Sequence, residues 1–530
     1  MAAQGYEQGL DQYTRVVQYL RSLIYTSSDA NTSCPVAMQD GAACLLKRHL
    51  EGNNLDSEKR RVFQNAFEHL ISRDPSKAWT SGQWMTERIG GSDVSRSETV
   101  ATYSPLSADA SLCDPSEDIS LGPWSIDGFK WFSSATDSNM TILLAKTQKG
   151  LSAFYAPMRR HNPALVVSAT GKAGGSELNG VTISRLKNKL GTKSLPTAEL
   201  ELRGMRAWLI GQEGQGIKEI ATILTVTRVR SAVGGLGYLS RGLSIARGFA
   251  EVREVGAGRG KRMKLTDSSL HMRTLANMTT EYHAMMLLTF YTCYVMGMEE
   301  HPTSARGPPS AIGFITPSPA SVSPLIRILT PLLKAYCTKQ VVPLLYACME
   351  SLGGVGFLEN TETEYLNVAR LFRDACVLNI WEGTTDVLTT DLIRALKHPK
   401  LGAGSIHALD SLVRTGDSVA KNTTIVAEWK SLKENIEQTP QDDLLVRGRD
   451  ILWKIAEILM ALLYLINAHN EDTAVIRYMC SCYLRSKGFL ERRDEDPETE
   501  TVQSILGLDQ AVVFGNAVKN MGDGDLTSKL

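Results

Sequence analysis

The sequence predicts an α+β fold in which helices dominate. Apolar residues recur at helical spacing in residues 1–79, short β-type runs separated by Gly, Asn, Asp and Ser occupy residues 80–211, and helical spacing returns over residues 212–400. Residues 401–530 add further helical segments. We therefore expect four parts in succession: N-terminal helices, a middle antiparallel β-domain, a helical bundle and a helical extension.

The first two parts follow from the spacing of apolar residues. In the N-terminal part Tyr13, Val16, Leu20 and Leu23 fall on one helical face. In the middle part, runs of β-forming residues end at turn-forming residues, which is the pattern of an antiparallel sheet. These runs are residues 141–145, 153–157, 165–168 and 200–202.

Three long helical segments predict the bundle, and they cover residues 267–299, 322–352 and 362–396. The most apolar run of the chain, Ile455 to Ala468, lies in the extension and contains Glu457. It is shorter than the ~20 apolar residues that a helix needs to cross a bilayer. We interpret it as a buried helix and expect no membrane span.

Charge and cysteine content exclude some classes of function. The 530 residues include 57 Lys and Arg and 57 Asp and Glu, so the formal net charge is zero. Nucleic-acid binding rests on an excess of basic charge, so we do not expect a nucleic-acid partner. The nine cysteines include no C-x-x-C pair, which favours neither a metal site nor a disulfide framework. A reducing compartment is the simplest interpretation.

The last three residues, Ser528, Lys529 and Leu530, form the peroxisomal address S-K-L. They follow a polar stretch that contains Gly522, Gly524 and Asp525. The alternative is a chance tripeptide. Because the import receptor reads this signal at the C-terminus, we expect the protein to bind that receptor and to enter the peroxisome.

Two motifs in the β region suit contact with a planar or phosphorylated ligand. Residues 82–95 read G-Q-W-M-T-E-R-I-G-G-S-D-V-S, and a glycine- and serine-containing loop can approach a ligand closely. Residues 127–134 read D-G-F-K-W-F-S-S, which places aromatic rings beside hydroxyls. The Asp127-Gly128 pair is typical of a hairpin turn. Taken singly, the first motif is equally typical of an ordinary turn and the second of a buried strand.

A third motif, in residues 371–388, places a carboxylate at a break between predicted helices. An apolar run ends in Trp381, Glu382 and Gly383. A partly desolvated carboxylate has its pKa raised toward the range of a general base. The alternative is an acidic residue that begins a helix and interacts with its N-terminal dipole.

Together the three motifs resemble the acyl-CoA dehydrogenase family, and within it the branch that contains the bacterial flavoprotein AidB. M-T-E-R-I-G-G-S-D-V is similar to the family's flavin loop, K-W-F-S-S to its second flavin strand, and I-W-E-G-T-T-D to its catalytic segment. The order and spacing match as well, as do R-L-K-N-K-L-G-T-K-S at residues 185–194 and G-Q-E-G-Q-G-I at residues 211–217. The resemblance covers roughly residues 34–398.

This resemblance implies an FAD cofactor between the β-domain and the bundle, and a homodimer or homotetramer. It implies α,β-dehydrogenation of an acyl-CoA thioester to trans-2-enoyl-CoA, in which Glu382 removes the α-proton and the flavin accepts hydride. The catalytic base would be Glu382. The residues that fall on the family's FAD-binding positions are Met85, Thr86, Gly91, Ser92, Phe132, Ser134, Arg253, Gly353, Gly354, Thr384 and Asp386.

The sequence departs from the family pattern in three places. About 80 residues precede the flavin loop, where the family has a longer helical domain, so we expect a shortened N-terminal domain. The segment after the predicted FAD-binding arginine lacks the Phe-Gly pair of the family. Its basic residues Arg259, Lys261, Arg262 and Lys264 face either phosphates or solvent. Glu350 stands where the family often has Gln.

Several functions remain open from the sequence. The enzyme could be a dehydrogenase or an oxidase that uses O₂, and its acyl chain could belong to fatty-acid β-oxidation or to a secondary metabolite, because chain selectivity depends on pocket shape. An alternative is an AidB-like flavoprotein that binds DNA and has little acyl-CoA activity. Another is a non-catalytic relative that binds acyl-CoA or a protein partner.

Overall fold

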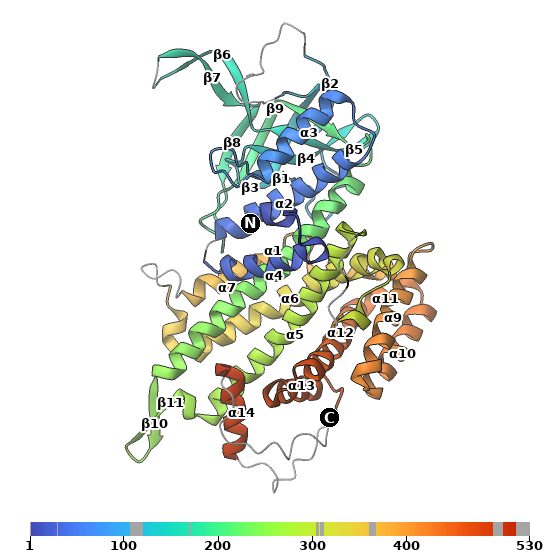
Figure 1. The fold of residues 1–530 in the computed structure, drawn as a ribbon. Coiled ribbons are helices and arrows are strands. Elements are labelled where there is room, and N and C mark those ends of the chain that lie inside the picture. Colours follow the sequence, from blue (N-terminus) through green and yellow to red (C-terminus); the bar gives the residue numbers. More distant parts are fainter. Residues whose placement is uncertain are drawn as a thin grey trace. The chain divides into compact units, whose positions relative to one another are not determined.

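The computed structural model confirms the predicted fold class, a mostly helical α+β fold with a sheet in the middle of the chain (Figure 1). The predicted targeting tripeptide, Ser528, Lys529 and Leu530, lies outside the described residues and stays a prediction. The structure describes residues 2–28, 30–106, 120–168, 171–303, 307, 312–359, 367–490 and 502–515.

The chain divides into two compact units. The first comprises Met1–Gly9 and Ser28–Arg230, and the second comprises Leu10–Ser27 and Ser231–Leu530. The predicted N-terminal helices are therefore shared between the units, and the boundary at Arg230 falls inside a continuous helix. The predicted boundaries followed changes in secondary structure, whereas the two units follow contacts between residues distant in sequence.

The first unit contains a β-sheet, two helices and the start of a third helix. Its helices are α2 (Ala30–Glu51), α3 (Ser57–Leu70) and the first part of α4 (Gly216–Val252), and η1 (Ala2–Tyr6) precedes them. Asp56 caps α3 by accepting a hydrogen bond from the Lys59 N–H at 2.7 Å. The strands are β1 (Ser81–Trp84), β2 (Val100–Tyr103), β3 (Trp124–Ser134), β4 (Met140–Thr147), β5 (Gly150–Pro157), β6 (Arg159–Val167), β7 (Lys172–Leu178), β8 (Val181–Leu186) and β9 (Thr197–Ile210).

The seven-stranded sheet closes on itself. Its strands β2, β3, β9, β5 and β4 each pair with the next, and β4 pairs again with β2. Most of these pairs are antiparallel, as predicted, while β4 pairs in parallel with β1 and β2. Closure satisfies backbone groups that an open sheet would leave at its edges. Strands β6 and β7 form a separate hairpin that projects from the sheet (Figure 1).

Strand β4 is buried on both faces and separates two apolar cores. Ile142 and Leu144 pack with α2, α3 and the start of α4 on one face. Leu143 and Ala145 pack with the other strands inside the curved sheet. The alternation follows from the two-residue period of a β-strand. It also explains why the run 141–145 is apolar throughout rather than alternating.

The predicted hairpin at Asp127 and Gly128 is wrong. Both residues lie inside the eleven-residue strand β3, which pairs with β2 on one side and β9 on the other. The pairing with β9 shifts register between Ile126 and Gly128, and the Asp127 carboxylate accepts a hydrogen bond from the Gly204 N–H at 2.8 Å. A Cβ at Gly128 would lie 2.5 Å from Thr99 Oγ1. The glycine therefore allows β3 to pass close to Thr99 and does not form a turn.

The second unit consists of helices and one β-hairpin. After η2 (Asp11–Tyr13), its helices are α1 (Thr14–Thr26), the remainder of α4, α5 (Ser269–Glu300), α6 (Pro319–Ser351), α7 (Val368–Cys376), α8 (Thr385–Leu396), α9 (Gly402–Ala420), α10 (Thr423–Gln438), α11 (Gln441–Val446), α12 (Gly448–Glu471), α13 (Ala474–Ser486) and α14 (Val502–Phe514). The hairpin pairs β10 (Glu254–Gly258) with β11 (Lys261–Lys264). Short 3₁₀ turns are η3 (Leu265–Asp267), η4 (Gly313–Ile315), η5 (Gly353–Phe357) and η7 (Val377–Asn379).

Helix α12 confirms the predicted buried helix. It packs against α5, α6, α8 and α9, with Ile455, Leu459 and Leu463 buried. By length and composition alone it is the one helix among the described residues that could cross a bilayer, but 72% of its most apolar window is buried inside the protein. This burial is typical of a core helix, because a membrane span presents its apolar side chains to lipid.

Glycine at position 297 allows α5 to pass close to the segment before α1. A Cβ there would lie 2.0 Å from the Gln12 carbonyl oxygen, whereas a Cβ at Gly404 of α9 would meet nothing within 4 Å. We predict that Gly297→Ala destabilises the protein by about 1–3 kcal/mol, since the backbone must shift. Gly404→Ala, the control, should stabilise it by about 0.5–1 kcal/mol. Urea unfolding measures both, and equal stability of the two variants would contradict the packing described.

Candidate active site

In the first unit, the predicted flavin loop lies directly beside the predicted flavin strand. The Trp131 N–H of β3 donates to the Thr86 carbonyl oxygen at 2.9 Å. The loop then turns back, because Glu87 and Gly90 exchange backbone hydrogen bonds of 2.9 and 3.2 Å. Met85 is buried, whereas Gly91 and Ser92 are exposed. A Cβ at Gly91 would lie 3.2 Å from Thr86 Cγ2, so the glycine lets the loop fold closely over Thr86.

A β-bulge sets the direction of the side chains in the predicted flavin strand. Lys130 pairs with Leu200 and Ser133 with Ala198, so β3 carries one extra residue there. Phe132, in the bulge, remains 49% exposed although it is a large apolar residue. Ser134 shares a hydrogen bond of 2.8 Å with Thr197, whose hydroxyl also accepts from Lys189 Nζ at 3.0 Å.

A buried ion pair joins the loop to the strand. Lys130 Nζ lies 2.6 Å from Glu87 Oε1 and donates to the Leu144 carbonyl at 2.7 Å. Both side chains are buried, at 0% and 3% exposure. Burial acts to raise the pKa of Glu87, but the charge and hydrogen bond of Lys130 and the Glu98 N–H outweigh it, so the pKa is lowered. Burial lowers the pKa of Lys130, and Glu87 offsets part of this effect.

In the second unit, Glu382 lies at the predicted break between helices. α7 ends at Cys376 and η7 at Asn379, and α8 begins at Thr385 with Thr384 as its N-cap residue. Between them, Glu382 has φ 59° and Gly383 has φ 102°, so two successive residues adopt left-handed conformations. Glu382 is half-buried. A non-glycine residue in this conformation is strained, and such strain is concentrated at functional sites.

Helix α6 holds this turn from one side. Lys334, which is fully buried, donates from Nζ to the Gly383 carbonyl oxygen at 2.5 Å. One helical turn later, the Thr338 hydroxyl donates to Asn379 Oδ1 at 3.0 Å. These contacts flank Glu382 in the sequence. Sequence analysis missed both, because Lys334 and Thr338 lie in an apolar helix more than forty residues before the residues they contact.

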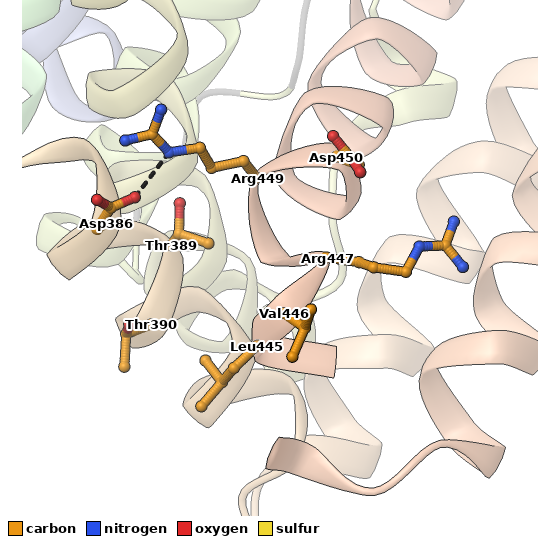
Figure 2. Close-up of a pocket in the computed structure, with 8 residues that line it drawn as sticks. All are labelled: Asp386, Thr389, Thr390, Leu445, Val446, Arg447, Arg449 and Asp450. Atoms are coloured by element: carbon orange, nitrogen blue, oxygen red, sulfur yellow. Dashed lines mark hydrogen bonds and ion pairs between the residues drawn. The ribbon is translucent and has the colours of Figure 1, made fainter. Parts of the chain in front are cut away.

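Asp386 lines a surface pocket of about 420 Å³ between α8 and the α11–α12 segment (Figure 2). Its carboxylate lies 2.7 Å from Arg449 Nε, and this hydrogen bond with Arg449 lowers the pKa of Asp386. The Thr389 hydroxyl is buried beside the pocket and has no hydrogen-bond partner among the described residues. Gly448 permits this close packing, since its Cβ would lie 2.6 Å from Thr389 Cγ2.

The other predicted FAD-binding residues of the second unit lie on different elements. Arg253 is exposed and directly follows α4, and Gly353 and Gly354 open η5 with both residues exposed. Among the described hydrogen bonds and ion pairs, none joins these three residues to the turn that carries Glu382. The basic residues predicted after Arg253 form the hairpin β10–β11, where Arg259, Lys261, Arg262 and Lys264 are mostly exposed.

The chain is similar to several known proteins. The family model "Acyl-CoA dehydrogenase, C-terminal domain" matches residues 214–397, which include Glu382 and both helices that flank it. A curated relative, acyl-CoA dehydrogenase family member 11 of Caenorhabditis elegans, is 35% identical over 462 residues, which is 84% of this chain and 64% of the relative.

The chain belongs to the acyl-CoA dehydrogenase family.

Two further proteins are similar to this chain. The putative acyl-CoA dehydrogenase AidB of Escherichia coli is 27% identical over 381 residues, covering 72% of this chain and 60% of AidB. The crystal structure of C. elegans ACDH-11 in complex with C11-CoA superposes with a TM-score of 0.70 at 29% identity, covering 98% of this chain and 78% of that chain. The chain spans about three fifths of the length of the two curated relatives.

Within the acyl-CoA dehydrogenase fold, the residue assignments stay predictions. The structure brings Thr86 and Gly91 together with the strand that carries Phe132 and Ser134. In the second unit it places Glu382 and Thr384 in one turn and Asp386 on the helix that follows. The contacts that build these arrangements, above all Glu87–Lys130 and Lys334–Gly383, were not predicted.

The buried Glu87–Lys130 pair predicts a strong effect of removing one partner. Lys130→Met should cost about 3–5 kcal/mol of unfolding free energy, because it leaves a buried carboxylate unpaired. Adding Glu87→Gln should restore part of the loss. Lys149→Met, which breaks the exposed Lys149–Glu213 pair, is the control and should cost about 1 kcal/mol or less. Urea unfolding of these variants checks the prediction.

The contribution of Glu87 to the free energy of unfolding depends on pH. Because the pKa of Glu87 is lowered in the folded state, its stabilisation is present above the ordinary value of 4.5 and is lost as the pH falls below it. The difference in unfolding free energy between wild type and Glu87→Gln should therefore become smaller as the pH falls below 4.5. A difference that widens as the pH falls would contradict the ion pair.

Proposed function

We propose that this protein is an FAD-dependent enzyme that dehydrogenates an acyl-CoA thioester to the trans-2-enoyl-CoA, with Glu382 as the base. The observation that carries the proposal is that Glu382 lies in a left-handed turn between η7 and α8. The resemblance of I-W-E-G-T-T-D to the family's catalytic segment supports its assignment as the base. A half-buried carboxylate in a fixed turn suits proton abstraction, which requires defined geometry before it requires a tuned pKa.

The residues of each unit fit the family cofactor. FAD is the cofactor of the acyl-CoA dehydrogenase family, and when bound it supplies the acceptor for two electrons and a proton, delivered as hydride. In the first unit, Phe132 leaves an apolar ring exposed two residues before Ser134, and Gly91 lets the loop fold closely over Thr86. In the second unit, the Trp381 Nε1–H is buried next to Glu382 and has no partner among the described residues, so it can donate to a ligand.

The role of Glu382 is to take the α-proton of the thioester. Loss of this proton places negative charge on the thioester oxygen, which a hydrogen-bond donor must stabilise. In the family this donor is the backbone N–H of the base residue, which here belongs to Glu382. The turn would therefore orient the proton acceptor and the oxygen-binding N–H together, so its backbone conformation matters as much as the carboxylate.

Replacing Glu382 by Gln tests the assignment of the base. The amide keeps the size of the side chain but cannot accept the proton, so we expect the variant to fold and to bind FAD with activity reduced by at least about 10²–10⁴-fold. Steady-state turnover with an acyl-CoA and an artificial electron acceptor measures the loss. Turnover equal to wild type would contradict the role of Glu382.

The reaction itself is tested by titrating the purified flavoprotein with acyl-CoAs of several chain lengths under anaerobic conditions. Bleaching of the oxidised flavin band by one class of thioester supports the proposed reaction. Reoxidation by air would then assign an oxidase, and its absence a dehydrogenase that needs a protein electron acceptor. A flavin that stays oxidised with every thioester would contradict the proposal and favour the DNA-binding or the non-catalytic alternative, which salt-dependent DNA binding separates.

We also propose that the protein acts in the peroxisome and assembles as a homodimer or homotetramer, as the family does. The support for the location is the S-K-L sequence of Ser528, Lys529 and Leu530, read by the import receptor. The pathway of its acyl chain, fatty-acid β-oxidation or secondary metabolism, belongs to the same proposal and depends on which chain bleaches the flavin.

Deletion of residues 528–530 tests the location. An N-terminally fluorescent fusion of the full chain should colocalise with a peroxisomal marker, and the deletion should make it diffuse. Thr527→Ala, directly before the tripeptide, is the control and should leave import unchanged. A deletion variant that is still imported would contradict a role for the tripeptide.

A further inference from the structure

The turn at Glu382 is held in a conformation that its own sequence does not favour. Glu382 has φ 59° and is not a glycine, and Gly383 follows with φ 102°. Only glycine adopts the left-handed region at little cost, so the conformation of Glu382 persists only where surrounding contacts impose it. The contacts that impose it must come from the elements packed against residues 377–384.

Lys334 of α6 provides one of these contacts. Its Nζ lies 2.5 Å from the Gly383 carbonyl oxygen, in the residue that directly follows the strained one. The side chain is fully buried, where an ammonium group loses its hydration. An apolar side chain of similar length would fill the same space without that loss. A lysine at this position is therefore best explained by what its charged group binds.

Thr338 extends the same interaction to the other side of the base. It follows Lys334 by one helical turn, so both side chains project from the same face of α6. Its hydroxyl donates to Asn379 Oδ1 at 3.0 Å, three residues before Glu382. Helix α6 thus contacts the segment on both sides of Glu382. A rigid helix that fixes both flanks also fixes the direction in which the Glu382 side chain leaves the backbone.

We propose that Lys334 is a positioning residue: its hydrogen bond to the Gly383 carbonyl maintains the left-handed turn that aims the Glu382 carboxylate and N–H at the substrate. The inference rests on the proposed function for its catalytic consequence, but its structural part, a lysine that maintains a strained turn, can be tested without any turnover.

The structural test is a double-mutant cycle between Lys334→Met and Glu382→Gly, measured as melting temperatures of the full chain with and without FAD. Glu382→Gly should raise the melting temperature, because glycine adopts the turn without strain. Lys334→Met should lower it in the wild-type background and lower it clearly less in the Glu382→Gly background. Equal decreases in melting temperature in the two backgrounds would overturn the proposal. A lysine that only fills space would contribute the same stability whichever residue stands at position 382.

The catalytic test separates kcat from KM in the FAD-loaded enzyme. Lys334→Met should lower kcat about 10–100-fold with little change in KM or FAD content, since a displaced base affects the chemical step. Thr330→Val is the matched control: Thr330 is also buried in α6, but among the described residues its hydroxyl bonds only within the helix, to the Ile326 carbonyl at 3.0 Å. Unchanged kcat in Lys334→Met, or an equal loss in Thr330→Val, would overturn the proposal.

Two outcomes remain distinguishable. If the wild type does not turn over any thioester, the proposed function fails, and the melting cycle still decides whether Lys334 maintains the turn. If Lys334→Met does not fold, Lys334→Gln enters the same cycle: it removes the charge but keeps an N–H donor, and a melting loss independent of residue 382 would overturn the proposal in the same way.

Discussion

The left-handed turn at Glu382 and Gly383 is the constraint on which the proposed chemistry of the second unit depends. It ends one helical path at Asn379 and begins another at Thr385, so the carboxylate leaves the backbone at a corner rather than from a helical face. Glu382, which is not a glycine, would not hold this conformation alone. The turn therefore depends on its contacts with α6. The neighbouring helices hold α6 in place, so the conformation at Glu382 depends on packing throughout the second unit.

The helical extension is part of that support. Its long helix α12 packs against α5, α6 and α8, and Gly448 brings it close to Thr389 of the helix that follows Glu382. Lys487, directly after α13, lies 3.2 Å from Glu281 of α5 and 3.4 Å from Glu457 of α12, so a half-buried polar cluster joins the extension to the bundle. Burial raises the pKa of Glu457, and Lys487 offsets part of that rise. The extension thus buries apolar surface of the bundle and does not stand apart from it.

The sequence predicted the parts of the structure that local patterns encode. The apolar runs of β4 and β5, the buried helix α12 and the helix break at Glu382 each follow from the period of apolar residues and from Gly383 after the acid. Sequence reasoning failed where two distant segments meet. Asp127 and Gly128 read as a turn locally, but pairing with β2 and β9 places them inside a strand. Glu87 and Lys130 are 43 residues apart, and Lys334 and Gly383 are 49, so no local signal joins them.

The central claim is that Glu382 removes the α-proton of an acyl-CoA, and proton exchange measures this step apart from electron transfer. The FAD-loaded protein would be incubated in D₂O with an acyl-CoA whose β-carbon carries no hydrogen, so that only the α-position can react, and deuterium uptake would be followed by mass spectrometry. Wild type should exchange the α-hydrogens, and Glu382→Gln should not. Equal exchange by both proteins would contradict the role of Glu382, and absence of exchange in wild type would contradict the proposed reaction.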